Sequence, residues 1–268
     1  MWHPNKAAFR AGSIGSAGTE WDDPNTGYYS WAGGYNTTGL GLASFAMGYQ
    51  STALGSYSTA LGYTANADGT GAVALGYRVT ADADYAVSLG HRASADGHSG
   101  TFNFGDESTT DSIEATANNQ FNARAAGGFR FRTNATLTTG CNLPAGSGVF
   151  SCSSSRALKE HFGVVDGEEL LARLRGVPVS TWSYISEGGQ VRHLGPFAED
   201  FRAAFGLGTD DRSIGLLDID GVNFAAVKAL ESRTAELQRQ LGERDQRIAD
   251  LEARLARIEA ALAARPSN

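Results

Sequence analysis

The residue types best suited to chemistry in this chain are a serine and a lysine, Ser154 and Lys159, which lie five positions apart. A serine hydroxyl is a weak nucleophile until a base removes its proton, and a lysine amine acts as that base once it is desolvated. At this spacing the two side chains meet only where the backbone turns. The pair alone carries little weight, because serine and lysine are common on protein surfaces, so the surrounding residues decide its interpretation.

The residues that follow form an ordered series of motifs. They are Ser154-Ser155-Arg156-Ala157-Leu158-Lys159, Trp182-Ser183-Tyr184, His193-Leu194-Gly195-Pro196, Ala198-Glu199-Asp200-Phe201 and Asp218-Ile219-Asp220-Gly221-Val222. In this order, over about residues 154–232, the chain resembles the endosialidase-type intramolecular chaperone family. The entry motif of that family reads serine, aspartate, arginine, a variable residue, leucine and lysine. Ser155 stands where the family has the aspartate.

The resemblance implies a mixed α/β domain that trimerises, helps the preceding fibre to fold and then cuts itself off. The cut would fall between Ser153 and Ser154, with Ser154 as the nucleophile and Lys159 as its general base. No substrate pocket is needed, because the scissile bond belongs to the same chain, and proximity of this kind supplies about 7–11 kcal/mol. The remaining signature residues are Arg156, Leu158, His193, Gly195, Pro196 and Asp200.

The serine at position 155 leaves an alternative open. If the family's aspartate orients the lysine or the cleaved strand, cleavage here is slow or absent, and the protein is a non-cleaving trimeric adhesin with a permanent C-terminal clamp. We expect His193 to hold trimer contacts rather than to catalyse. The spacing of Asp200, Asp218 and Asp220 suits helix caps and turns better than a calcium loop, so no metal and no cofactor are expected.

Upstream of these motifs, glycine recurs at multiples of seven residues, at Gly41, Gly48, Gly55, Gly62, Gly69, Gly76, Gly90 and Gly97, with Ala83 breaking the register. Glycine disfavours a helix by ~1 kcal/mol per residue relative to alanine. Small residues alternating with Val, Leu and Tyr favour short strands with glycine at tight corners, which predicts a β-solenoid. Residues 27–99 resemble the head repeats of trimeric autotransporter adhesins. That resemblance implies a left-handed parallel β-roll, with three chains side by side.

One position of the repeat carries an aromatic ladder. Tyr49, Tyr63, Tyr77 and His91 follow one another at intervals of 14 residues. We predict that this ladder packs, between coils or between chains, and the alternative is an exposed binding stripe. The receptor itself stays open, as a host-surface glycan or a protein.

Residues 100–153 lose the glycine rule and show a period of two, the signature of strands. The apolar members are Phe102, Phe104, Phe121, Phe129 and Phe131. We predict a strand-rich neck, with Arg130 and Arg132 on its solvent face. Cys141 and Cys152 are either a disulfide or two buried thiols, because no partners lie at metal-ligand spacing.

Near the C-terminus the apolar residues step by three and four, at Val227, Leu230, Leu237, Leu241, Ile248, Leu251, Leu255, Ile258 and Leu262. Thr234 and Arg244 occupy the two remaining core places. Over five heptads this pattern predicts a coiled coil rather than an amphipathic helix lying on a globule. At 1.5 Å per residue, 224–264 would extend roughly 60 Å. A polar Arg244 in the seam would lower stability and set the register.

Composition excludes several classes of function. The formal net charge is −7, and we find no basic patch or stripe of the kind that nucleic-acid binders carry. Anionic membrane surfaces repel an acidic chain, and no stretch approaches the ~18 apolar residues of a membrane helix. The start, Met1-Trp2-His3-Pro4, lacks the basic and apolar regions of a signal peptide. We expect neither a nucleic-acid partner nor membrane insertion.

The expected architecture is a mainly β, partly α homotrimer. Its parts are an N-terminal segment (1–26), a β-roll head (27–99), a strand-rich neck (100–153), a chaperone and autoprotease domain (154–232) and a coiled coil with tail (233–268). The expected location is a phage virion tail or a bacterial cell surface. We reject a glycan-degrading enzyme, because the residues before the cut hold no paired carboxylates in a credible catalytic setting and a β-roll offers no deep pocket.

Overall fold

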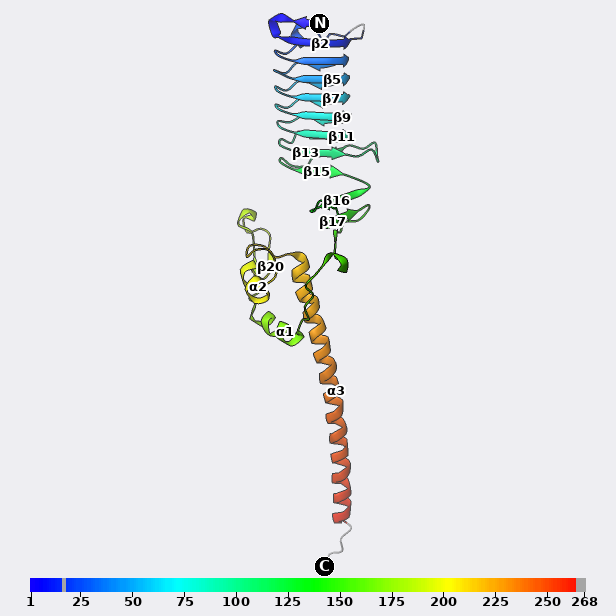
Figure 1. Ribbon diagram of the computed structural model, residues 1–268, viewed down its shortest axis with the longest axis vertical. Helices are drawn as coiled ribbons and strands as arrows, with labels where there is room; N and C mark the ends of the chain where they lie inside the picture. Colours follow the sequence, from blue (N-terminus) through cyan, green and yellow to red (C-terminus); the bar gives the residue numbers. More distant parts are fainter. Residues whose placement is uncertain (16–17, 264–268) are drawn as a thin grey trace, which may run out of the picture. The chain divides into compact units, whose positions relative to one another are not determined.

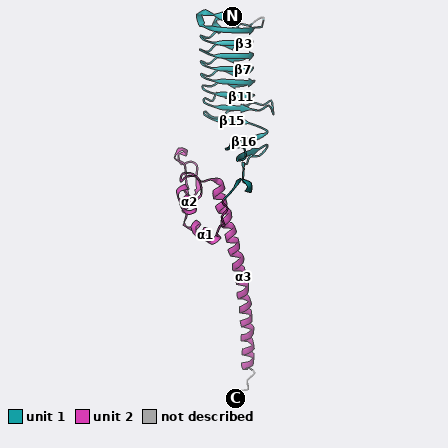
Figure 2. Cartoon of the chain, viewed as in Figure 1, with its two compact units in different colours: residues 1–160 teal, residues 161–268 magenta. Residues whose placement is uncertain are grey.

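The computed structural model describes residues 1–15 and 18–263. The chain divides into two compact units, Met1–Glu160 and His161–Asn268 (Figures 1 and 2). The first unit consists of β-strands and short 3-10 helices, and the second is mixed α/β with one long C-terminal helix. The predicted fold class, mainly β with α and with solenoid repeats near the N-terminus, is confirmed.

The first unit is built on a nine-stranded sheet in the order β1-β2-β3-β5-β7-β9-β11-β13-β15 (Figure 1). Its strands are β1 (Trp2–His3), β2 (Ala8–Ser13), β3 (Trp31–Tyr35), β5 (Phe45–Tyr49), β7 (Thr59–Tyr63), β9 (Val73–Tyr77), β11 (Val87–His91), β13 (Phe102–Gly105) and β15 (Phe121–Arg124). All neighbours from β2 onward are parallel. Phe45 pairs with Thr59 and Thr59 with Val73, so each of these coils spans fourteen residues.

A second sheet of six short strands closes each coil. It contains β4 (Thr38–Gly39), β6 (Thr52–Ala53), β8 (Asn66–Ala67), β10 (Thr80–Ala81), β12 (Ala93–Ser94) and β14 (Ile113–Glu114). Between the two sheets lies a core made almost entirely of alanine. Ala46, Ala60 and Ala74 are fully buried at successive coils. Small side chains suffice because the sheets of a narrow coil lie close together.

The glycine repeat follows from close backbone contact at the two corners of each coil. A Cβ atom on Gly48, whose φ is +119°, would lie 2.0 Å from the carbonyl oxygen of Gly62 in the next coil. At the other corner, a Cβ atom on Gly55 would lie 1.9 Å from the carbonyl oxygen of Gly69. No residue with a side chain fits at such separations. Two corners per fourteen-residue coil therefore produce a glycine every seven residues.

The parallel ladder runs beyond the range assigned to the head repeats from sequence. β2 precedes residue 27, and β13 and β15 lie in the segment expected to form the neck. These last coils depart from the fourteen-residue rule, since Val87 pairs with Phe102, fifteen positions on. The strands expected around Phe102 and Phe121 are present and continue the solenoid, with the two rings stacked at 5.0 Å.

Polar side chains close the alanine core at its N-terminal end. Arg10 is in register with Ala32 and is fully buried. Its Nη2 donates to the hydroxyl of Ser30 and the carbonyl of Gly39, both at 2.9 Å, and its Nη1 donates to the carbonyl of Ser30 at 3.1 Å. Burial lowers the pKa of the Arg10 guanidinium. The arginine thus adds side-chain hydrogen bonds to two carbonyls that also accept from the backbone N–H groups of Phe9 and Gly27.

After the solenoid, three strands form an antiparallel sheet: β16 (Gly128–Arg132), β17 (Gly140–Pro144) and β18 (Ser151–Cys152). Arg130 is exposed, as expected from sequence. Arg132 departs from the expectation, because it is only half-exposed and its Nη2 donates to the side-chain oxygen of Asn142 at 2.6 Å. Cys141 and Cys152 pair in register and form a disulfide, which decides between the two alternatives left by the sequence.

In the second unit, α1 (Gly167–Gly176) packs against α3 (Leu216–Ala263) and contacts α2 (Ala198–Phe205). Leu170 and Leu171 of α1 form a small core with Ala226 of α3. The helices approach closely, since a Cβ atom on Gly167 would lie 2.8 Å from that of Ala229. Asp166 caps α1, because its carboxylate accepts hydrogen bonds from the N–H groups of Glu168 and Glu169, at 2.9 and 3.0 Å.

The long helix α3 includes the whole predicted coiled-coil stripe, and that stripe is uncovered in the single chain. Leu237, Leu251 and Ile258 keep 57%, 53% and 56% of their surface exposed. Monomeric soluble proteins rarely leave so long an apolar face in water. An apolar repeat of three and four residues is the pattern that parallel chains bury against one another.

Candidate active site

The structure brings Ser154 and Lys159 together. The Nζ of Lys159 donates to the Oγ of Ser154 at 2.7 Å. A short 3-10 helix, η3 (Arg156–Leu158), makes this contact, because it reverses the chain between the two residues. Backbone hydrogen bonds from Leu158 to Ser155 and from Lys159 to Arg156, both 3.1 Å, fix the turn. The backbone turn that the five-residue spacing required is therefore present.

Ser155 starts this turn. Its Oγ accepts a hydrogen bond from the N–H of Ala157 at 3.3 Å and caps the 3-10 helix. Aspartate and serine are both strong caps at such positions. The serine in place of the family's aspartate thus retains a capping oxygen, although it lacks the negative charge.

The residue before Ser154 is fixed by the antiparallel sheet. The N–H of Ser153 donates to the carbonyl of Gly140 at 2.9 Å, and its hydroxyl donates to the same carbonyl at 3.0 Å. Cys152, one position earlier, is joined to Cys141 by the disulfide. The Ser153–Ser154 bond therefore lies where an anchored strand ends and the turn begins.

Solvent surrounds the pair in the single chain. Every residue from 151 to 166 is exposed. A general base needs the neutral amine, which removal of water favours. One chain supplies the geometry of a serine–lysine pair but not its desolvation.

The other signature residues fall into two groups. Arg156 and Leu158 belong to η3, beside the pair. His193 and Gly195 belong to β20 (His193–Gly195), Pro196 follows that strand, and Asp200 lies in the first turn of α2. This second group lies in the second unit, which begins at His161.

His193 is held in an aromatic cluster. β19 (Ser180–Trp182) pairs antiparallel with β20 and sets Trp182 opposite His193. The two rings stack at 4.7 Å, and the ring of Tyr184 meets His193 edge-on at 5.5 Å. The Nε2 of His193 lies 3.1 Å from a carboxylate oxygen of Glu187. The two motifs Trp182-Ser183-Tyr184 and His193-Leu194-Gly195-Pro196 are thus one packed unit.

Sequence reasoning missed Glu187. No sequence signal marks it, because a capping box is recognised by a serine or threonine at the N-cap, where this chain has Tyr184. Glu187 accepts a hydrogen bond from the N–H of Tyr184 at 2.9 Å and lies 3.1 Å from the Nε2 of His193. This arrangement fits a positioning role for His193 within its own domain.

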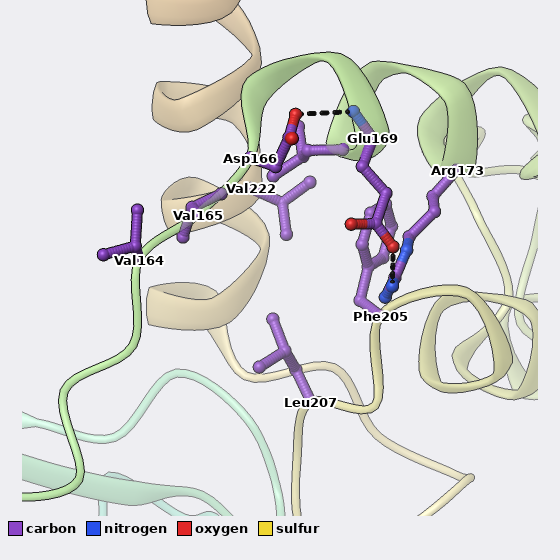
Figure 3. A pocket seen from close by; sticks show the side chains of 9 residues that line it. Val164, Val165, Asp166, Glu169, Arg173, Phe205, Leu207 and Val222 are labelled. Atoms are coloured by element: carbon purple, nitrogen blue, oxygen red, sulfur yellow. Dashed lines mark hydrogen bonds and ion pairs between the residues drawn. The ribbon is translucent and has the colours of Figure 1, made fainter.

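A hollow of about 250 Å³ opens beside α1 (Figure 3). Val164, Val165, Leu207 and Val222 line it together with the ring of Phe205. Its polar groups are already paired, since Asp166 caps the helix and Glu169 forms an ion pair with Arg173. The lining resembles a packing gap more than a catalytic pocket. Among residues 1–15 and 18–263, no cluster of His, Cys, Asp and Glu is arranged to hold a metal ion.

The chain thus combines a parallel β-solenoid with a mixed α/β unit whose long helix carries an uncovered apolar stripe. Residues 154–206 match the family described as chaperone of endosialidase, and residues 32–58, 40–63 and 55–78 match the YadA head domain repeat. Both resemblances inferred from sequence are confirmed. No curated protein and no solved structure is significantly similar to the chain.

The chaperone match begins at Ser154, the serine of the candidate pair, and ends at Gly206. The motif around Asp218–Val222 and the long helix lie outside it. The two families imply trimeric assembly and suggest a surface or extracellular protein. In the part of the chain that the structure describes, no helix has the length and apolar character needed to cross a membrane.

Proposed function

We propose that this chain is a trimeric fibre protein whose C-terminal domain assembles three chains and then cleaves itself off between Ser153 and Ser154. Ser154 is the nucleophile and Lys159 its general base. The observation that carries the proposal is the 2.7 Å contact between the Lys159 Nζ and the Ser154 Oγ, at the first residue of the chaperone match.

In this mechanism the neutral amine of Lys159 accepts the proton of the Ser154 hydroxyl. The Oγ then attacks the carbonyl carbon of Ser153, and the Ser153–Ser154 C–N bond breaks as the Ser154 amine takes up a proton. The product is an ester between the Ser153 carbonyl and the Ser154 Oγ. Water hydrolyses this ester, leaving a carboxylate on Ser153 and a free hydroxyl on Ser154. The reaction runs once and has no external substrate.

Assembly supplies what the single chain lacks. The Lys159 side chain is exposed, so docking of three chains is the step that excludes water from it and makes the neutral amine available. Cleavage then follows trimerisation rather than preceding it. This order matters for folding, because release of the domain before the head has folded would remove the part that holds the three chains together.

The uncovered stripe of α3 brings the three chains into register. The β-solenoid upstream depends on contacts between coils, which form slowly when chains are not aligned. Once the domain has been released, the fibre cannot unfold by the path along which it assembled. Cleavage therefore gives kinetic stability rather than extra equilibrium stability.

The alternative function is a non-cleaving trimeric adhesin with the C-terminal domain as a permanent clamp. Its supporting observation is Ser155, which lacks the carboxylate of the family motif. The capping bond from the Ala157 N–H favours the cleaving form, because the turn is kept without that carboxylate.

Intact mass measurement decides between the two. Wild type is expected to yield fragments 1–153 and 154–268, whereas Ser154→Ala and Lys159→Ala stay whole. Ser153→Ala is the matched control, because it alters the adjacent serine and leaves both proposed catalytic groups in place. Wild type that stays at full length after folding and trimerisation would rule out self-cleavage and leave the clamp.

A further inference from the structure

A second set of tyrosines lies on the solenoid at the corner that precedes the long strands. Tyr29, Ala43, Tyr57, Gly71 and Tyr85 occupy equivalent positions, each donating its N–H to the carbonyl of a residue in the coil before. Every second coil thus carries a tyrosine, with a small residue between. The period is 28 residues, twice that of the ladder, so the sequence repeat does not reveal it.

The backbone at this corner disfavours tyrosine. Tyr29, Tyr57 and Tyr85 have φ values of 58°, 61° and 59°, in the left-handed region that costs a side-chain-bearing residue about 1–2 kcal/mol. Burial does not offset this cost, because the three side chains keep 67%, 62% and 68% of their surface exposed. Gly71 occupies the same corner without that penalty. The same left-handed φ recurs at Ala43, at 51°, so this backbone conformation belongs to the coil. What distinguishes the three tyrosines is their exposure.

These rings also differ from the ladder in what they offer to a ligand. In the ladder Tyr49 stacks on Tyr63 at 5.0 Å, and Tyr63 on Tyr77 at 4.9 Å, so neighbouring rings cover the faces. Within the described residues, neither Tyr57 nor Tyr85 has an aromatic partner, whereas the ring of Tyr29 lies 6.4 Å from that of Tyr28 in a tilted arrangement. Tyr85 leans toward Gly71, where an added Cβ atom would lie 3.1 Å from its ring. One edge of the Tyr85 ring thus lies near Gly71, and the side chain keeps 68% of its surface exposed.

The spacing of the rings selects the ligand. Stacked coils advance by about 4.8 Å, so tyrosines two coils apart are separated by about 10 Å. That distance is close to the length of one disaccharide unit in an extended β-1,4-linked polysaccharide. In such a polymer every second pyranose presents the same apolar C–H face. We propose that Tyr29, Tyr57 and Tyr85 bind a neutral β-1,4-linked polysaccharide lying along the solenoid.

Charge at the corner determines which polysaccharides fit. The segments 40–44, 54–58, 68–72 and 82–86 contain three aspartates, Asp68, Asp82 and Asp84, and neither lysine nor arginine. These aspartates all lie toward the Tyr85 end of the row, where they repel uronic or sialic acid polymers and admit uncharged sugars. At the other end Lys6 lies 5.9 Å from the ring of Tyr28. The site is independent of self-cleavage, because it lies in the head and uses none of the residues at the proposed cut.

The test uses the full chain with soluble cellohexaose and chitohexaose, measured by calorimetry, and with amorphous cellulose and chitin, measured by co-sedimentation. Wild type is expected to bind at least one of these neutral polymers and not alginate, an anionic one. Tyr57→Ala/Tyr85→Ala is expected to weaken binding at least tenfold, while Tyr57→Phe/Tyr85→Phe retains most of it because the ring faces remain.

A spacing variant provides the matched control. Tyr57→Ala/Ala43→Tyr keeps the number of tyrosines and places them one and three coils apart, so it is expected to lose at least tenfold as well. Circular dichroism and sedimentation confirm that each variant is folded and keeps its oligomeric mass. Wild type that binds neither neutral polymer overturns the proposal. So does equal binding by the spacing variant, or dissociation of the assembly on loss of the tyrosines, which would make the corner a subunit interface.

Discussion

Cys152 is disulfide-bonded to Cys141 directly across the β17–β18 ladder, and it lies two residues before Ser154. Ser153 continues the pairing through its hydrogen bond to Gly140, 2.9 Å long. A cut after Ser153 would therefore leave a new C-terminus that is covalently tied to the neighbouring strand. The downstream domain could then be released while the disulfide still holds the neck together.

Cys141→Ser/Cys152→Ser is expected to destabilise the neck by about 2–3 kcal/mol, the effect of opening a short disulfide loop. The free energy of unfolding of the upstream fragment, measured in denaturant, gives the value. Wild type treated with dithiothreitol should match the double variant. An unchanged midpoint in both samples would mean that the disulfide adds no stability here.

Ser155→Ala removes the cap of the turn that joins Ser154 to Lys159. Loss of a cap costs about 1 kcal/mol, which corresponds to roughly a fivefold slower cleavage if the turn must form in the reacting state. Ser155→Asp restores both cap and charge and should cleave at least as fast as wild type. Densitometry of fragments over time measures both rates, and equal rates for all three proteins would contradict a role for the cap.

Arg10→Met keeps the side-chain volume but removes the donors to Ser30 and Gly39. The carbonyls of Ser30 and Gly39 keep their backbone donors, the N–H groups of Phe9 and Gly27. The variant therefore loses only the hydrogen bonds of the arginine, and the free energy of unfolding of the head should fall by about 2–3 kcal/mol. Arg130→Met, at an exposed position, is the control and should change it by less than about 0.5 kcal/mol. Denaturant unfolding followed by tyrosine fluorescence measures the difference, and equal midpoints would refute the capping role.

The carboxylate of Asp106 should make the stability of the folded state depend on pH. Its carboxylate accepts from the N–H of Ala126, the hydroxyl of Ser108 and the Nε of Arg124, and these donors, Ala126 first, hold the pKa of Asp106 well below its usual range. A depressed pKa stabilises the folded state above the unfolded value of about 4 and loses this effect as pH falls toward the folded value.

The melting temperature of Asp106→Asn should therefore lie below that of wild type at pH 7, with the gap narrowing below about pH 4. Glu107→Gln, at the exposed neighbouring position, serves as the control and should show no such gap. Thermal melts from pH 7 to pH 3 provide the comparison. A gap that stays constant over this range would assign the effect to shape rather than charge.

Arg244 occupies a core place of the apolar stripe. Arg244→Leu is expected to stabilise the assembled coil by about 1–3 kcal/mol per chain, because a leucine is buried in place of a charge. If the arginine sets the register, the variant should also form more than one oligomer. Arg257→Leu lies outside the stripe and should change neither property. Light scattering and thermal melts report the two effects, and a variant less stable than wild type would place Arg244 in favourable contacts instead.

Three features are evident from the order of the residues alone: the coils, the C-terminal domain and the candidate pair. Glycine at Gly48 and Gly55 marks corners where adjacent backbones nearly touch, a requirement that the residue type records directly. The stripe through Leu237, Leu251 and Ile258 has the period of a helix whatever it packs against. Ser154 and Lys159 were singled out by type and by the motifs around them.

Where these patterns end, and which distant groups meet, becomes evident in the three-dimensional fold. Arginine usually lies at the surface, so the neighbouring residues do not predict that Arg10 is buried at the end of the alanine core. The pairing of Cys141 with Cys152 depends on strand register, and so does the row formed by Tyr29, Tyr57 and Tyr85. Burial and strand register depend on contacts between residues far apart in the chain. Composition and periodicity reflect only the local backbone conformation and the face that each residue occupies.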